Sequence, residues 1–276
     1  DTGPVTMQIH QAFLGNLEFA NLPRKYKISV SACPERCVHP EIQCVALVGT
    51  TRTAGGKTEI GFDLRVGGGL STQAFVSQRR NVFLKPEEVL EVVKTITTIW
   101  RDSPEYREKR HHARFKYLIH DWGVAKFRQV LQEQLGRTLE EAPPEYREPS
   151  DTYRDHVGVH AQKQPGMYYV GAPVLVGRIT SSQMKKAADL SRRYGDGKTL
   201  RLTNRQNLLI LNVSETHVER VLGGLVEVGL SVNAHPVRRS VVTCTGTEFC
   251  KLAITETKVR SREIVEYLEQ RVPLEE

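Results

Sequence analysis

The feature that most constrains the fold is a charged, proline-containing segment near the middle of the chain. This segment, Glu140 to Pro149, contains three prolines, and a pattern of strands followed by helices precedes it and starts again after it. We interpret it as a linker. Because 276 residues suit roughly two domains with cores of their own, we expect an α/β chain divided near this point.

The first half begins with segments in which apolar and polar residues alternate, which is typical of half-buried strands. Three such strands are predicted, at Tyr26–Ser31, Glu41–Val48 and Ile60–Val66. From Pro86 onward the period changes to that of a helix with one apolar face. Two further helices, the first of them strongly basic, are expected at Glu105–His120 and Val124–Leu135.

The second half again combines strands and helices, but here the two kinds of element alternate along the chain. Strands are predicted at Met167–Val176, Leu200–Leu202 and Leu208–Val213. Helices are predicted at Ser181–Tyr194, with Ser181 or Ser182 as its cap, and at Ser214–Val228. This order of strand, helix, strand, strand and helix resembles a ferredoxin-like half domain.

Composition and charge exclude several classes of protein. With 39% hydrophobic and 26% charged residues, the chain is neither collagen, an extended disordered tail nor a coiled coil. It contains no run near the ~20 apolar residues of a membrane span and begins without the apolar run of a signal peptide. We therefore expect a soluble, cytoplasmic protein. The absent initial methionine and the stop directly after a helical pattern predict a piece of a longer protein.

The net charge of +7 indicates anionic or acidic partners. A charge of this size does not choose among nucleic acid, acidic protein and small anions.

The five cysteines, an odd number, argue against a disulfide framework. They are Cys33, Cys37, Cys44, Cys244 and Cys250. The spacing Cys244-x5-Cys250 fits zinc badly, whereas iron–sulfur ligation by thiolates tolerates varied spacings. The alternative is that these cysteines are free and pack as small hydrophobic residues.

Several stretches taken together resemble the siroheme-dependent nitrite and sulfite reductases. They occur in that family's order and cover nearly the whole chain: Leu22–Lys27, Gly61–Gly69, Gln162–Gly166, Arg201–Asn207, Cys244–Cys250 and Glu256–Lys258. Any one of them is a weak signal, but the ordered set is a strong one.

The resemblance implies a duplicated α/β (α+β) architecture in which each repeat has a ferredoxin-like half followed by a siroheme/4Fe–4S domain. Residues 1–142 are similar to the siroheme/4Fe–4S-type domain of the first repeat, and residues 143–235 to the second ferredoxin-like half. Residues 236–276 are similar to the start of the second siroheme/4Fe–4S domain. On this resemblance the architecture is incomplete at both ends.

The resemblance also implies siroheme coupled to a 4Fe–4S cluster. Cys244 and Cys250 match the first cysteine pair that holds the family's cluster. The second pair, a later Cys-x3-Cys, has no match after Cys250. Cys33 and Cys37 have that spacing but fall at the corresponding place in the first repeat, so we interpret them as a vestige of duplication.

Lys25, Lys27 and Gln206 are the remaining candidate site residues. Lys25 and Lys27 are two apart on a predicted strand, so their ammonium groups should emerge on one face. A small anionic substrate needs such a concentration of positive charge, and the resemblance assigns these lysines to the substrate. It assigns Gln206 to the macrocycle. The alternatives are a solvated strand face for the lysines and a turn residue for Gln206.

The function implied is six-electron reduction of nitrite to ammonia, with sulfite reduction to sulfide as the alternative. The Lys163 region and the Cys244–Cys250 motif look closer to the nitrite branch. An acidic donor such as ferredoxin would supply electrons. The basic helix is either a charged outer face or the surface on which this donor docks.

Two rivals remain. One is a non-catalytic basic module that binds nucleic acid, with zinc on Cys33, Cys37 and Cys44, but its basic stretch has few aromatic residues for base stacking. The other is a pseudoenzyme that keeps the fold without cofactors. We expect neither a nucleic-acid nor a membrane partner.

Overall fold

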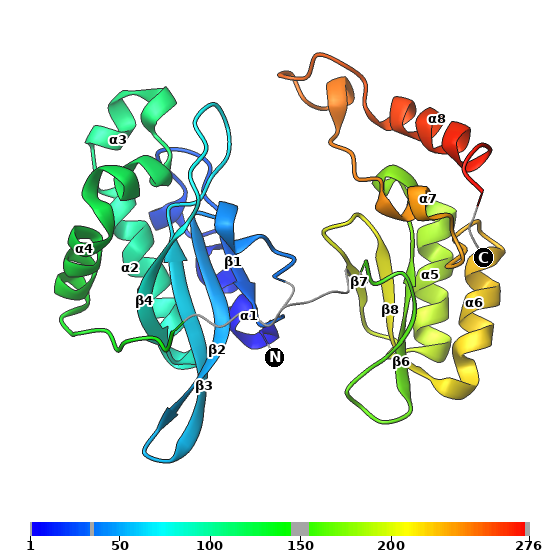
Figure 1. Ribbon diagram of the computed structural model, residues 1–276, viewed down its shortest axis with the longest axis horizontal. Coiled ribbons are helices and arrows are strands. Elements are labelled where there is room, and N and C mark those ends of the chain that lie inside the picture. Colours follow the sequence, from blue (N-terminus) through cyan, green and yellow to red (C-terminus); the bar gives the residue numbers. More distant parts are fainter. Residues whose placement is uncertain (1, 34–35, 145–154, 274–276) are drawn as a thin grey trace. The chain divides into compact units, whose positions relative to one another are not determined.

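The computed structural model describes residues 2–33, 36–144 and 155–273. The chain forms two compact units, Asp1–Asp151 and Thr152–Glu276, each with a four-stranded sheet (Figure 1). The expected mixed α/β fold is confirmed. The division between the units falls just beyond the expected linker, of which residues 145–149 lie outside the described part of the chain. The domain boundaries expected at residues 142 and 235 stay predictions.

The sheet of the first unit has the strand order β1-β2-β3-β4. Its strands are β1 (Ile28–Ser31), β2 (Val45–Ala54), β3 (Lys57–Val66) and β4 (Gln78–Leu84). β1 runs parallel to β2, and the other neighbours are antiparallel. The turn between β2 and β3 consists of Gly55 and Gly56, both with positive φ (56° and 76°), as a two-residue hairpin requires.

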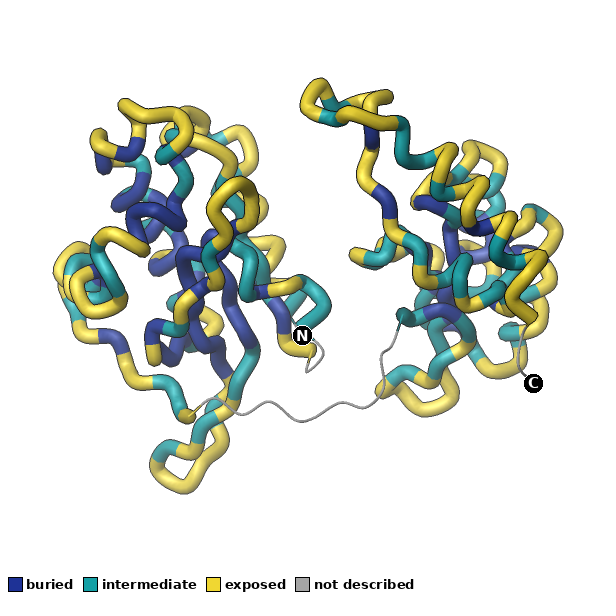
Figure 2. Tube along the Cα trace, turned by 45° about the horizontal axis from the view of Figure 1, so that its top comes forward, coloured by how far each residue is buried: buried dark blue, intermediate teal, exposed yellow. Residues whose placement is uncertain are grey.

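Helices supply most of the first unit's core. They are α1 (Gly3–Phe13), α2 (Val89–Arg101), the short α3 (Glu105–Glu108) and α4 (Phe115–Leu135). The apolar face of α2 predicted from the sequence is buried, with Val92, Ile96 and Trp100 inaccessible to solvent. Figure 2 shows this buried interior between the sheet and the helices. Tyr26 stacks on Trp100, with 5.0 Å between ring centroids, and so fixes the segment that precedes β1.

The prediction of a single basic helix over residues 105–120 is wrong. α3 ends at Glu108, a 3₁₀ turn covers Arg110–His112, and α4 starts only at Phe115. The backbone is extended at Arg114, so the two residues that follow, Phe115 and Lys116, enter the protein interior instead of forming an outer face. α4 then continues through the predicted third helix, with a kink at Gly123.

The second unit has an antiparallel sheet with strand order β5-β6-β8-β7. Its strands are β5 (Gly158–Ala161), β6 (Met167–Ala172), β7 (Leu200–Leu202) and β8 (Leu208–Ser214). α5 (Ser181–Tyr194) and α6 (Val218–Val226) pack on it around Leu190, Ile210 and Leu225. α5 has the bounds that the sequence predicts.

The cap of α5 is Thr180, not Ser181 or Ser182. Its hydroxyl accepts a hydrogen bond from the backbone N–H of Gln183, 3.2 Å away, while both serines already have helical positions. Beyond α6, the chain forms α7 (Pro236–Ser240), a 3₁₀ turn at Gly246–Glu248, and α8 (Lys258–Glu269).

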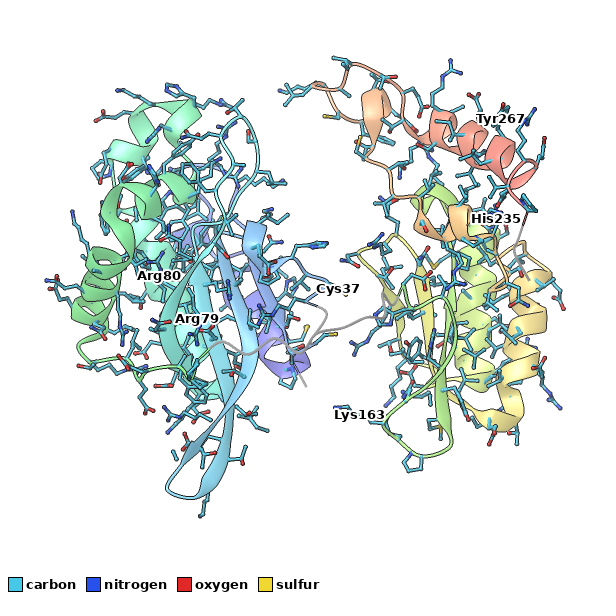
Figure 3. All side chains as sticks on the ribbon, viewed as in Figure 1. Cys37, Arg79, Arg80, Lys163, His235 and Tyr267 are labelled. Carbon is cyan, nitrogen blue, oxygen red and sulfur yellow. The ribbon has the colours of Figure 1, made fainter. Side chains whose placement is uncertain are left out.

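β4 carries an arginine whose environment is unusual. Arg80 is only 1% exposed, and none of its three guanidinium nitrogens has a hydrogen-bond partner among the described residues. Its guanidinium lies over the Phe127 ring, 5.6 Å from the centroid. Burial lowers the pKa of Arg80 to about 10. The neighbouring Arg79, labelled with it in Figure 3, forms an ion pair with Asp63.

Replacing Arg80 with methionine is therefore expected to stabilise the protein, by about 2 kcal/mol, because an unpaired buried charge is removed and the volume is kept. The midpoint of urea unfolding measures this. The matched control, Arg79→Met, should lower the midpoint, since it deprives the nearly buried Asp63 carboxylate of a cation 2.5 Å away. A loss of stability in Arg80→Met as large as in the control would contradict this interpretation.

Candidate functional site

Lys25 and Lys27 lie on an extended segment immediately before β1, which begins at Ile28 and not at Tyr26 as expected. Between them, the Tyr26 side chain enters the core, where its hydroxyl accepts a hydrogen bond from Thr97 (3.2 Å). Side chains alternate along an extended backbone, so the two lysines emerge on the side away from Tyr26. Lys25 is exposed and Lys27 half-buried.

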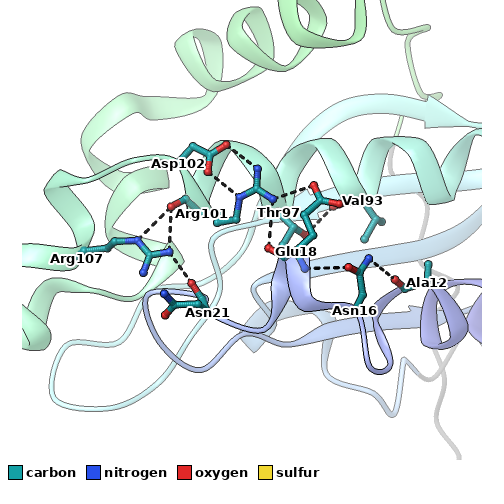
Figure 4. A network of polar contacts seen from close by, with 9 residues as sticks. All are labelled: Ala12, Asn16, Glu18, Asn21, Val93, Thr97, Arg101, Asp102 and Arg107. Atoms are coloured by element: carbon teal, nitrogen blue, oxygen red, sulfur yellow. Dashed lines mark hydrogen bonds and ion pairs between the residues drawn. The ribbon is translucent and has the colours of Figure 1, made fainter.

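The approach to this segment is held by a network of polar contacts around Arg101 (Figure 4). Arg101 forms ion pairs with Glu18 (2.8 Å) and Asp102 (2.7 Å). Arg107 donates to the carbonyls of Asn21 and Arg101, at 2.6 and 3.2 Å. These contacts join the chain just before Lys25 to the end of α2, which limits the positions that the lysines can adopt.

Positive charge gathers around Lys27. Burial lowers the pKa of Lys27, and the charges of Lys25 and Arg114 lower it further, while Cys44 opposes the change. The Arg114 guanidinium lies 4.0 Å from the Cys44 sulfur. A lysine whose pKa is lowered in this way binds an anion while charged and releases its proton more readily.

Lys116 extends the cationic region into the interior. It is 1% exposed, and its ammonium group donates to the carbonyls of Leu70 (3.0 Å) and Gln73. Burial and the charges of Arg114 and Arg24 lower its pKa. The role of Lys116 is not evident from the sequence, because a lysine in a basic stretch gives no sign that it will be buried.

The glycine run Gly67–Gly69 allows the loop after β3 to pack against this region. A Cβ on Gly68 would lie 2.5 Å from the Glu41 carbonyl oxygen, and one on Gly69 would lie 3.2 Å from the Arg114 guanidinium. Side chains at these positions would therefore collide with the Glu41 backbone or crowd Arg114, which is why glycine is needed here.

A shallow pocket of about 380 Å³ lies next to the lysine segment and is basic. It is lined by Pro23, Arg24, Arg107, Arg110 and Ala113. Arg24 and Arg107 use part of their guanidinium groups to bind backbone carbonyls. Among the described residues, no acidic side chain lines the pocket, so those residues do not repel an approaching anion.

The second unit holds the Cys244–Cys250 loop. Cys244 is exposed and Cys250 partly exposed. The loop closes through a hydrogen bond from the Cys250 N–H to the Gly246 carbonyl (3.0 Å). The backbone N–H of Gly246 and the Thr257 hydroxyl lower the pKa of the Cys244 thiol, with a smaller contribution from Lys258. These contacts favour the thiolate, which is the form that binds metal.

Gln206 lies in the turn between β7 and β8 with a positive φ of 64°. Its side-chain amide donates to the Thr243 carbonyl (2.7 Å) and accepts from the Thr243 N–H (3.3 Å). Both polar atoms thus contact the backbone next to Cys244. The expected contact of Gln206 with the macrocycle stays a prediction.

The thiols of the loop suit part of a 4Fe–4S site. Cys244 and Cys250 are soft donors, and the surroundings of Cys244 favour its thiolate form; the two could supply two of the four thiolates that a 4Fe–4S cluster would need. Across the described residues, no group of three or more His, Cys, Asp or Glu side chains could hold a metal ion. The residues present therefore fit half of the cluster's ligand set.

Comparison with known protein families covers both units. Residues 1–139 match the model for the nitrite and sulphite reductase 4Fe-4S domain. Residues 160–228 match the nitrite/sulfite reductase ferredoxin-like half domain. The chain belongs to the nitrite and sulfite reductase family. Members of this family carry siroheme and a 4Fe–4S cluster, so the resemblance found in the sequence is confirmed.

Relatives of this family include enzymes named for either substrate. Sulfite reductase [ferredoxin] 1 of Mycolicibacterium paratuberculosis is 39% identical over 99% of this chain and 47% of its own length. The assimilatory ferredoxin-dependent nitrite reductase of Haloferax mediterranei is 37% identical over 92% of this chain and 45% of its own. The solved structure of Mycobacterium tuberculosis NirA superposes with a TM-score of 0.88 at 38% identity, covering 98% of this chain and 48% of that one. The chain spans about half the length of these relatives.

Membership in the reductase family weakens the rival built on zinc and nucleic acid. Cys44 is buried in the core of the first unit, Cys33 is exposed, and Cys37 is partly exposed. Figure 3 labels Cys37, together with Lys163 in the exposed turn between β5 and β6.

No helix among the described residues has the length and apolar character needed to cross a membrane.

Proposed function

We propose that the protein containing this chain reduces nitrite to ammonia with six electrons, using siroheme and a 4Fe–4S cluster. The observation that carries this proposal is the pairing of two features in one chain. The first unit has Lys25 and Lys27 in cationic surroundings, and the second has a Cys-x5-Cys loop with a thiol that favours the thiolate. Siroheme and the cluster, when bound, supply the electron transfer that side chains cannot perform.

In this proposal, Lys25 and Lys27 bind the substrate anion. Their positive charges favour an oxyanion and stabilise the negative charge that develops as electrons arrive. Lys27 also supplies protons, because burial and neighbouring cations lower its pKa and so ease proton release. Cys244 and Cys250 ligate the cluster, and Gln206 lies beside the ligand segment with the macrocycle role that the family motif implies.

The electron donor is proposed to be an acidic protein such as ferredoxin, which the relatives' names include. The basic pocket formed by Arg24, Arg107 and Arg110 has the charge that such a donor requires. Salt would then weaken donor docking more than it weakens catalysis with a small uncharged reductant.

Sulfite is the second candidate substrate. It is favoured by relatives named sulfite reductase that are 39% identical, against 37% for the haloarchaeal nitrite reductase. Both substrates are small oxyanions that need the same cations and the same electron count, so the lysines alone do not separate them.

Steady-state kinetics of the holoenzyme with a chemical reductant tests the proposal. We expect kcat/KM for nitrite to exceed that for sulfite at least about tenfold, equivalent to about 1.4 kcal/mol of differential transition-state binding. The reverse ratio would assign sulfite. Absence of turnover with either anion, in protein that holds siroheme and the cluster, would overturn the proposed function. Folded protein that binds neither siroheme nor the cluster would support the pseudoenzyme rival.

A further inference from the structure

The backbone leading into Cys244 is held by side chains from two other parts of the second unit. We propose that Gln206 and Thr257 are positioning residues that place Cys244 for its metal before any metal binds. This inference rests on the proposed function of Cys244 as a cluster ligand. We use the name Thr243 clamp for these two residues together with Lys258.

Gln206 provides the first contact of the clamp. Its amide pairs with both the N–H and the carbonyl of Thr243, as a neighbouring strand would, across 37 positions in the sequence. The turn supports this arrangement, since the Gln206 N–H donates to the Thr203 carbonyl (3.0 Å). Gly177 leaves the necessary space, because a Cβ there would lie 2.9 Å from the Gln206 side chain.

Thr257 provides the second contact, on the cysteine itself. Its hydroxyl donates to the Cys244 carbonyl at 2.8 Å, and the Cys244 sulfur lies 3.8 Å from the same oxygen. Gly246 allows this approach. A Cβ on Gly246 would lie 2.7 Å from the Thr257 hydroxyl, and its φ of 62° also favours glycine.

Thr257 is itself held at the start of α8. The Glu256 carboxylate accepts hydrogen bonds from the N–H groups of Lys258 (2.8 Å), Val259 (2.8 Å) and Arg260 (3.2 Å). This satisfies three donors that a helix start leaves free. The threonine hydroxyl is thereby attached to a regular helix and not to a mobile loop.

Lys258 joins the two contacts. Its ammonium group donates to the carbonyl of Val176 and, at 3.4 Å, to that of Thr243. The Thr243 carbonyl therefore receives hydrogen bonds from both Gln206 and Lys258. Thr243 is buried, whereas Cys244 directly after it is exposed. The clamp fixes the backbone and leaves the sulfur accessible to a metal.

Metal ligands bind best when neighbouring groups orient them in advance, and the loss of such groups costs roughly 10- to 100-fold in metal affinity. A two-cysteine loop that presents half of a cluster site has little other means of fixing its geometry. We therefore expect the clamp to affect how long the cluster is retained, without any contact between Gln206 or Thr257 and iron.

Thr257→Val tests the clamp, because valine keeps the shape and removes the hydroxyl, and Thr257→Ser is the matched control that keeps it. In the metal-free chain we expect hydrogen exchange of the amides between residues 243 and 250 to be about five- to tenfold faster in Thr257→Val and Gln206→Leu. Thr257→Ser should exchange like the wild type. In the holoenzyme, iron loss to a chelator should be roughly tenfold faster in the first two variants and unchanged in the third.

Exchange equal to wild type in both Thr257→Val and Gln206→Leu would overturn the clamp. Faster exchange with an unchanged rate of iron loss would overturn its role in positioning the ligand. A wild-type holoenzyme without iron is a separate result. It would refute the proposed function, and the positioning role that rests on it, even if the exchange data showed that the clamp exists.

Discussion

Replacement of Cys244 or Cys250 with serine is expected to remove the 4Fe–4S cluster from the holoenzyme. A serine hydroxyl is a much poorer ligand for cluster iron than a thiolate, and the loop offers no third donor among the described residues. Iron content, acid-labile sulfide and the broad visible absorption of the cluster should all fall to background. Because the cluster carries electrons to the reaction, turnover should be lost as well.

Cys33→Ser and Cys37→Ser are the matched controls for this result. Both thiols belong to the first unit, and we interpret them as a vestige that does not ligate the cluster. Their variants should keep full iron and sulfide. If Cys244→Ser and Cys250→Ser retained the wild-type content while either control lost it, the assignment of the ligands would be reversed.

Lys25→Ala and Lys27→Ala should each lower kcat/KM by about 30-fold or more. Removing one charge-assisted contact to the reacting anion costs about 2 kcal/mol of transition-state stabilisation. Siroheme content should be unchanged. Lys57→Ala, at the exposed tip of the β2–β3 hairpin, is the control and should behave as wild type. Unchanged kinetics in both site variants would show that these lysines belong to an ordinary solvated surface and do not bind the substrate.

The lowered pKa of Lys27 predicts how substrate binding depends on pH. Because the pKa of Lys27 is lower than the ordinary lysine value of 10.5, Lys27 becomes neutral at a lower pH than an ordinary lysine does. Affinity for the anion should therefore fall as the pH rises through this lowered pKa. Lys27→Arg keeps its charge over the whole range. Its KM should therefore rise less than that of the wild type between about pH 7 and pH 10.

The sequence predicts those elements whose periodicity is local. α5 has the predicted bounds because its apolar positions and its polar start lie within a few turns of each other. β4 is not evident from the sequence, because it begins with polar residues, contains the buried Arg80 and takes its strand geometry from pairing with β3. The strand expected at residues 41–48 begins only at Val45, because Pro40–Ile42 form a 3₁₀ turn.

The candidate site shows the same limit. Its residue types could be read from spacing and family motif, since Lys25-x-Lys27 and Cys244-x5-Cys250 are short-range patterns. The contacts of Gln206 with Thr243, and the burial of Lys116 under two loop carbonyls, depend on residues more than thirty positions apart. No local pattern contains that information.

Analysis of the purified holoenzyme for siroheme, iron and acid-labile sulfide, followed by counting the electrons consumed for each molecule of product, tests the central claim most directly. We expect siroheme and a four-iron cluster in equimolar amounts and six electrons per ammonia formed from nitrite, or per sulfide if sulfite is the substrate. Protein that lacks siroheme and labile sulfide as isolated and after reconstitution, or that consumes two electrons per product, would contradict the account.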